Sequence, residues 1–226
     1  MKRSILSSGL VAILLASVAA HADTTTPDTA QSPTYRPVAH ERRAGVEVGG
    51  GVGVGFGAAS GYTNNVKYLG NPDYYSSTPL LVGVAHQYFL MGALTDYLNV
   101  GPVVNIATFD TPSWRSTGFG VGFRFELFPL LYAVPALADT AVYAQMGIGS
   151  TRIAAKGPYP DSDGTQSFFG GGVHHEFRLA KLLGGHAAAG PFLEYDAVRS
   201  ETAERHWATA GLRLAWYGGT VGSDGR

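Results

Sequence analysis

The sequence predicts an all-β protein, an eight-stranded antiparallel up-and-down transmembrane β-barrel. Three observations lead to this prediction. Residues 116–128 alternate strictly between apolar side chains and glycine or charge, the same alternation recurs along the chain, and the first residues have the form of an export signal. In a strand, alternation with a period of two places every apolar side chain on one face. A membrane barrel turns that face toward lipid.

The first 22 residues have the pattern of a secretory signal peptide. Lys2 and Arg3 precede an apolar run, and the small residues Ala20 and Ala22 follow it, which is the arrangement of a cleavage site. A transmembrane anchor is the alternative, but the apolar run is shorter than the ~20 residues that cross a bilayer. Without Lys2 and Arg3 the formal net charge of −1 becomes more negative, so no nucleic-acid partner is expected.

The amino-acid composition excludes several kinds of site. The chain has no cysteine, so disulfide bonds, acylated cysteines and thiolate metal sites are impossible. We expect no cofactor and no metal site. The 31 glycines, 12 tyrosines and 11 phenylalanines are typical of a β-protein with aromatic girdles at the membrane surfaces.

These patterns divide the chain into four regions. Residues 1–22 form the predicted signal peptide and residues 23–43 a flexible periplasmic segment rich in threonine, proline and serine. Residues 44–217 form the predicted barrel, and residues 218–226 a carboxy-terminal tail. The segment 23–43 has no apolar period, and we expect no function of its own for it.

The first strand is predicted at residues 44–58, where valines alternate with a long face of glycines. Glycine weakens a strand and is usually placed where something approaches the backbone closely, so a narrow barrel interior fits this face. The Gly-x-Gly spacings could also suggest a dinucleotide-binding loop. The helix and the acidic residue that such a motif requires do not follow.

The other seven strands repeat the alternation. They are predicted at residues 80–94, 98–107, 116–128, 142–149, 169–179, 187–196 and 208–217. Pro102 and Pro191 lie within two of them. Because proline lacks the N–H group that a strand ladder uses, the register beside each proline is left open.

The connections fall into two alternating sets, as expected when one rim of a barrel faces the periplasm and the other the outside. Polar loops are predicted at residues 61–79, 110–115, 156–164 and 199–204, and the opposite rim has connections at residues 95–96, 128–139 and 180–185. The longest loop carries Tyr62, Tyr68, Tyr74 and Tyr75. These tyrosines are our candidates for contact with a surface partner.

A soluble, lipocalin-like barrel is the main alternative fold. Such a barrel needs a polar outer face. Here the second face of nearly every strand is glycine with isolated charges, which cannot solvate an exterior but can fill a narrow interior.

From residue 44 to residue 217 the chain resembles the small eight-stranded outer-membrane barrels of the OmpA/OmpX class. The resemblance rests on the alternating strands and on the aromatic-rich last strand, residues 212–217. It implies a protein of the outer membrane of a Gram-negative bacterium, with its amino terminus in the periplasm. It also implies outer-membrane lipid, lipopolysaccharide and the barrel-assembly machinery as partners, and it identifies no extracellular partner.

Charged residues of both signs collect on the inward registers. They form a predicted polar core inside the barrel, made of Glu47, Arg124, Glu126, Glu176, Arg178, Glu194 and Arg213, with Asp196 beside them. Burying a charge alone is costly, so we expect these groups to pair as a structural core. A catalytic or conducting site is the alternative.

The function expected from these residues is a structural or surface-interaction role in the bacterial envelope, without catalysis. A narrow pore or small-ligand carrier through the glycine-lined interior is the first alternative, and a lipid-modifying enzyme, as found in this architecture, is the second. His206 lacks the serine that a His-x-Ser deacylase pair needs, because Ala208 stands there. His86 and His175 fall on outward registers, and we expect both near a rim.

Overall fold

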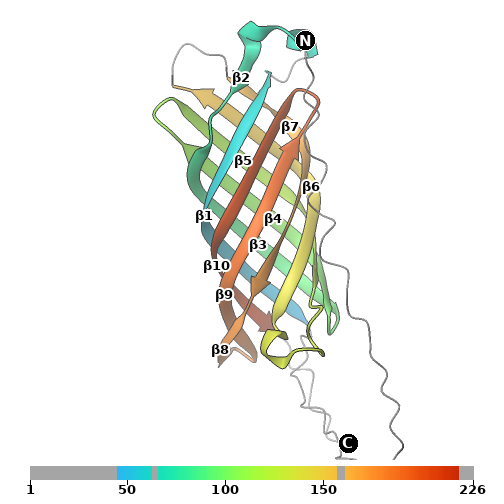
Figure 1. Ribbon diagram of the computed structural model, residues 1–226. Helices are drawn as coiled ribbons and strands as arrows, with labels where there is room; N and C mark the ends of the chain where they lie inside the picture. The colour runs from blue at the N-terminus through green and yellow to red at the C-terminus, as the bar shows by residue number, and fades with distance from the viewer. Residues whose placement is uncertain (1–44, 63–65, 157–160, 219–226) are drawn as a thin grey trace, which may run out of the picture. The chain divides into compact units, whose positions relative to one another are not determined.

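The strands of the computed structural model close into a barrel (Figure 1), described over residues 45–62, 66–156 and 161–218. The strands are β1 (Val46–Tyr62), β2 (Tyr75–Ser77), β3 (Leu81–Thr95), β4 (Leu98–Asp110), β5 (Trp114–Leu127), β6 (Thr140–Ala155), β7 (Ser162–His175), β8 (Phe177–Leu182), β9 (Gly185–Arg199) and β10 (Ala203–Gly218). Three short 3-10 helices lie in the connections: η1 (Val66–Tyr68), η2 (Pro72–Tyr74) and η3 (Pro135–Leu137). The predicted signal peptide, the segment 23–43 and all of the tail beyond residue 218 lie outside the described residues.

Every barrel strand pairs antiparallel with its neighbour in the chain. The order is β10-β1-β3-β4-β5-β6-β7-β9, and β10 also pairs with β9, so the sheet closes on itself. The closing seam between β1 and β10 is continuous from the pair Val46 and Gly218 to the pair Gly61 and Ala203. Because β8 continues the line of β7 and β2 adds only to the end of β1, eight strands form the wall. The predicted up-and-down barrel is confirmed.

The outer face of the wall is an apolar belt. Outward side chains such as Val54, Ile148 and Leu212 are 64%, 67% and 67% exposed. Above the belt, toward the rim with the longer loops, outward positions become polar at Thr108 and Ser150. A closed barrel with this exterior satisfies its backbone polar groups internally and presents hydrocarbon to lipid. The exterior is therefore that of a barrel that spans a membrane. No helix within the described ranges is long and apolar enough to cross a membrane.

The interior is packed in layers along the barrel. One apolar cluster, which includes Phe109, Phe168 and Trp207, lies toward the rim of the longer loops. A second, with Phe89 and Tyr217 among its members, lies in the opposite half. The third closes the other rim and consists of Phe128, Leu131, Ala138 and Ala141. The buried charged residues lie between these clusters.

The two prolines interrupt backbone pairing without changing the register. Between β3 and β4 the pairs Phe89 with Val103 and Gly92 with Val100 keep one register, and the two pairs between them, which include Pro102, are missing. Pro191 lies at a similar gap, where the pairing of β9 passes from β7 to β8. The missing N–H of proline explains both interruptions.

The gap at Pro191 corrects one prediction. The sequence suggested one strand over residues 169–179, but this strand breaks at Glu176, whose backbone N–H donates to Asp139 O at 3.1 Å. The ladder then shifts between Arg178 and Ala180. Arg178 precedes this shift and lies on β8, where every side chain is exposed, and it faces Asp139 at 3.9 Å. It is not part of the polar core inside the barrel.

The remaining differences concern strand ends. β1 begins two residues later than predicted and runs four residues further, to Tyr62. β6 and β10 are also longer than expected. The loop predicted at residues 61–79 contains η1, η2 and β2, and β2 pairs with the end of β1. Alternation fades near the rims because the medium outside changes from lipid to water, so the sequence pattern underestimates strand length there.

Candidate functional site

The inward glycines are recesses for side chains of other strands. A Cβ atom on Gly120 would lie 2.9 Å from the Phe168 ring, and Cβ atoms on Gly51 and Gly211 would lie 3.0 and 2.7 Å from Phe192 Cε1. Real Cβ atoms rarely approach other atoms this closely. The glycine face that suggested an open interior therefore makes room for large aromatic side chains, which fill it.

Arg213 is the centre of the first charged network. This network lies in the half of the barrel where β1 begins and β10 ends, and its arginine side chain is buried. Arg213 Nη1 donates to Glu126 Oε1 at 3.1 Å, and its Nε lies 2.9 Å from Glu176 Oε1. Its Nη2 forms a short ion pair with Glu47. The guanidinium also stacks 4.3 Å from the centre of the Phe89 ring.

Neutral side chains complete the same network. Asn99 Nδ2 donates to Glu47 Oε2 at 2.8 Å, and the Tyr217 hydroxyl donates to Glu176 Oε2. His174 Nε2 lies 3.6 Å from Glu126 Oε1. One arginine thus joins three carboxylates, which come from β1, from β5 and from the break between β7 and β8.

Arg124 is the centre of a second network in the middle of the barrel. Its Nη2 donates to Glu194 Oε2 at 2.9 Å and to Gln145 Oε1 at 2.7 Å. Its Nη1 lies 3.7 Å from Glu126 Oε1, which links the two networks. The Tyr143 hydroxyl donates to Glu194 Oε2 at 2.9 Å. The guanidinium stacks on the Tyr143 ring at 4.2 Å.

Two amides connect the carboxylates of this second network. Asn105 Nδ2 lies 3.1 Å from both Glu194 Oε1 and Asp196 Oδ2. Gln145 Nε2 donates to Asp196 Oδ1 at 2.6 Å. Glutamine and asparagine therefore hold Asp196 beside Glu194, the carboxylate that pairs with Arg124.

Arg205 is a third buried arginine, which the sequence reading missed. Its Nη2 donates to Ala107 O at 3.0 Å, and its guanidinium lies 4.9 and 4.7 Å from the rings of Phe109 and Trp207. It reaches over the backbone of Gly118. A signal was available, because Arg205 shares the odd-numbered inward register of β10 with Arg213, but the predicted strand began too late to include it.

The structure places the sequence-derived candidates in two groups. Six lie inside the barrel at 4% exposure or less, namely Glu47, Arg124, Glu126, Glu176, Glu194 and Arg213, and Arg178 lies outside it. Asp196 is also fully buried. The charged networks also include amide and phenol side chains. The sequence predicted that these side chains point inward, but not their hydrogen bonds.

The four tyrosines lie together at the rim of the longer loops. The rings of Tyr68 and Tyr74 stack at 3.9 Å with an angle of 11°, and those of Tyr62 and Tyr75 lie 5.0 Å apart. Asn71 caps η2 by accepting the backbone N–H of Asp73. These contacts give the loop a defined surface.

Four of the five histidines in the described ranges, His86, His174, His175 and His206, occupy different environments. His174 is buried in the first network. His175 lies at the rim where β1 begins and β10 ends, with Nδ1 2.8 Å from Thr140 Oγ1. His206 faces outward beside Tyr195, whose hydroxyl lies 2.7 Å from its Nδ1. His86 was expected near a rim and instead lies midway along the outward face of β3. Within the described ranges, no group of three or more histidine, aspartate or glutamate residues could hold a metal ion.

Comparison with known proteins adds structures of similar shape. The chain matches no protein-family model, and no curated protein matches it. The attachment invasion locus protein Ail of Yersinia pestis is 11% identical, with 76% of this chain and 99% of that chain covered and a TM-score of 0.48. Neisserial surface protein A is 14% identical, with 73% and 96% covered and a TM-score of 0.36. The amino-terminal barrel of Pseudomonas aeruginosa OprF is 9% identical, with 76% and 98% covered and a TM-score of 0.38. Identities and scores this low carry no information on ligand or role, so both must be inferred from the residues of this chain.

Proposed function

Starting from an eight-stranded barrel of the outer membrane, we propose a non-conducting, non-catalytic protein that serves the envelope structurally and through its outer loops. The observation that carries this proposal is the filling of the interior. Apolar clusters with Trp207 at one end and Phe128 at the other enclose two networks of paired charges. Aromatic rings occupy the glycine recesses between them.

The charged networks support a structural role because each buried arginine of a network is matched to carboxylates. Arg124 and Arg213 contact four buried carboxylates, those of Glu47, Glu126, Glu176 and Glu194, and burying a charge without a partner costs several kcal/mol. Networks of paired charges and hydrogen bonds make a core rigid. A permeation path would need these side chains to separate.

The tyrosine loop supports a role in surface interaction. Tyr75 is 42% exposed and Val66 is 64% exposed, and both lie beyond the lipid-facing belt on a loop held by stacked rings. Tyrosine presents a large contact area at low cost in conformational entropy. We propose this loop, with Tyr62, Tyr68, Tyr74 and Tyr75, as the surface that meets an extracellular partner. Lipid, lipopolysaccharide and the barrel-assembly machinery remain partners proposed from the barrel class.

Single-channel recording in a planar bilayer tests the closed interior. Wild-type protein should give no reproducible conductance steps. The double variant Trp207→Ala with Phe168→Ala removes the apolar cluster at the outer end and serves as a sensitised control. Reproducible steps from the folded wild-type protein would overturn the structural proposal in favour of a pore.

Two further measurements test whether the protein modifies lipid and whether the tyrosine loop contacts a surface. Mass spectrometry of lipid A from cells with and without the protein should give identical spectra, and a changed acyl pattern would indicate a lipid-modifying enzyme. Cells that carry the double variant Tyr68→Ala with Tyr74→Ala should keep wild-type detergent resistance and lose adhesion to any surface that wild-type cells bind. Equal adhesion would remove the loop from the proposal.

A further inference from the structure

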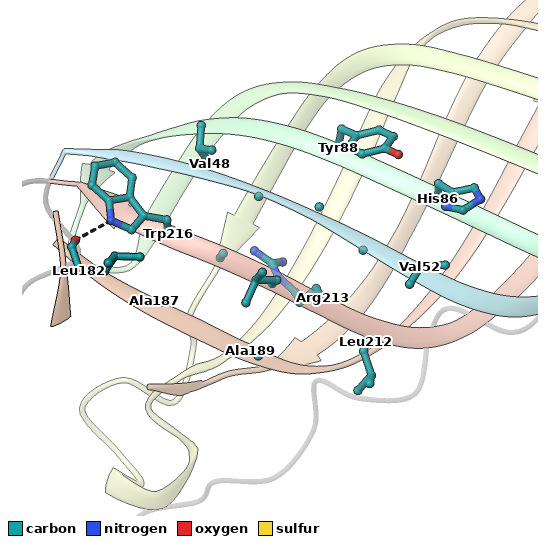
Figure 2. Close-up of a pocket in the computed structure, with 15 residues that line it drawn as sticks. Val48, Val52, His86, Tyr88, Leu182, Ala187, Ala189, Leu212, Arg213 and Trp216 are labelled. Atoms are coloured by element: carbon teal, nitrogen blue, oxygen red, sulfur yellow. Dashed lines mark hydrogen bonds between the residues drawn. The ribbon is translucent and has the colours of Figure 1, made fainter. Parts of the chain in front are cut away.

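The outer wall of the barrel carries a groove that the proposed function does not use. It has a volume of about 740 Å³ and lies across β9, β10, β1 and β3 (Figure 2). Its floor is formed by small outward residues, Gly50, Ala187 and Ala189. A cavity volume of ~300–1,000 Å³ with an apolar lining and few polar groups is typical of a small-molecule site.

The groove lies inside the lipid-facing belt. Val48, Val52 and Leu214 line it and are 45%, 50% and 59% exposed on the outer face. At one end Trp216 Nε1 donates to Leu182 O at 2.9 Å, close to the rim where β1 begins and β10 ends. At the other end stands His86 (Figure 2). Since the surrounding medium is hydrocarbon, the occupant is a molecule that dissolves in the membrane.

His86 restricts the chemistry of that occupant. It pairs across the sheet with Val52 and Ile106, and Val84 and Tyr88 are its outward neighbours along β3. Its imidazole therefore stands in the apolar belt, and it forms no hydrogen bond with any of the described residues. An ionisable side chain at such a depth is rare and usually marks a functional site. The occupant should bring a polar group to this point.

We propose that the groove binds one long-chain free fatty acid, with its carboxyl group at His86 and its hydrocarbon chain over Gly50, Ala187 and Ala189. A neutral imidazole has one acceptor nitrogen, and the O–H of a carboxylic acid can donate to it. An esterified chain has no donor for this nitrogen. The Tyr88 ring, which a Cβ on Gly50 would approach to 3.2 Å, forms one wall for the chain. Because residue 50 is a glycine, no side chain fills the groove at this point.

Native mass spectrometry of the full-length, folded protein released from detergent micelles tests the proposal. Titration with hexadecanoic acid should give one saturable adduct, and methyl hexadecanoate should bind at least about tenfold more weakly. This factor corresponds to the loss of one hydrogen bond. His86→Leu should weaken binding of the acid by a similar factor and leave binding of the ester unchanged.

Two phenylalanine variants separate the groove from general contact with lipid. Ala189→Phe fills the groove and should abolish the adduct. Ala144→Phe adds the same ring at an outward, exposed position on β6 and should leave binding intact. If Ala189→Phe fails to fold, as judged by the mobility of unheated protein on gels, Ala187→Leu takes its place.

Three results would overturn the proposal. Equal adducts in the two phenylalanine variants would mean that the fatty acid binds only as surrounding lipid. Equal binding of acid and ester would remove His86 from recognition. A dimer of the wild-type protein that Ala189→Phe disrupts, in the absence of a fatty-acid adduct, would assign the groove to a second copy of the chain.

Discussion

Arg213 on the last strand and Glu126 on β5 meet inside the barrel, with 3.1 Å between Nη1 and Oε1 and no solvent exposure of either side chain. β10 and β5 are not neighbours in the sheet. The ion pair therefore crosses the interior and joins opposite parts of the wall. Because Glu126 also lies 3.7 Å from Arg124 Nη1, one carboxylate couples the two networks that hold the barrel closed.

The Arg213→Ala variant should be strongly destabilised. It leaves Glu47, Glu126 and Glu176 buried around an empty position, and removing one partner of a buried pair costs about 3–5 kcal/mol. Urea unfolding in lipid vesicles, followed by the mobility of unheated samples on gels, measures this loss. Arg152→Ala is the matched control, because Arg152 is 63% exposed in its pair with Asp161 and should unfold close to wild type. Equal midpoints for the two variants would contradict a structural role for Arg213.

Arg124 and Glu194 should act as one unit. In a double-mutant cycle with Arg124→Met and Glu194→Gln, the double variant should lose less stability than the two single losses added together. For groups in one network, a coupling energy of about 0.5–3 kcal/mol is expected. Strict additivity in the same urea assay would show that their 2.9 Å contact does not contribute to folding.

Tyr217→Phe tests the neutral part of the first network. It removes the hydroxyl that donates to the buried Glu176, and an unsatisfied buried acceptor costs about 1–3 kcal/mol. Tyr132→Phe removes a similar hydrogen bond, at 3.2 Å to Asp96, from a ring that is 71% exposed. We expect this control to keep nearly full stability. A smaller loss in Tyr217→Phe than in Tyr132→Phe would argue against the network.

The alternation of residues was enough to predict the barrel and most of its interior. Glu126 and Arg124 share a parity within one uninterrupted strand, so their inward direction follows from the period of two. Arg178 shows where this reasoning fails. Arg178 keeps the register of His174, since it pairs with Ala188 before the ladder shifts, but every side chain of β8 is exposed. The strand breaks before β8, and we attribute the break to Pro191 on the neighbouring strand. A prediction made one strand at a time does not include that neighbour.

Two other features depend on contacts between strands and were not available from the sequence. The glycine face suggested missing volume, but the volume is supplied by Phe168 and Phe192 from β7 and β9. The outer groove depends on Gly50, Ala187 and Ala189 coming together across the closing seam. Gly50 is far from the two alanines in the chain, and nothing in the period of any one strand connects it to them.

The glycine recesses give the last prediction. Gly120→Ala should destabilise the barrel by about 1–3 kcal/mol, because its Cβ would lie 2.9 Å from the buried Phe168 ring and overpacking forces neighbouring side chains out of place. Gly92→Ala is the control, since its Cβ would meet only Val100 O at 3.8 Å. Replacing glycine within a strand at an open position should be neutral or slightly stabilising. In addition, Phe168→Leu should recover part of the loss in Gly120→Ala. If both alanine variants unfold at the same urea concentration, the interior has free space at Gly120, and the glycine face would again be a candidate path through the barrel.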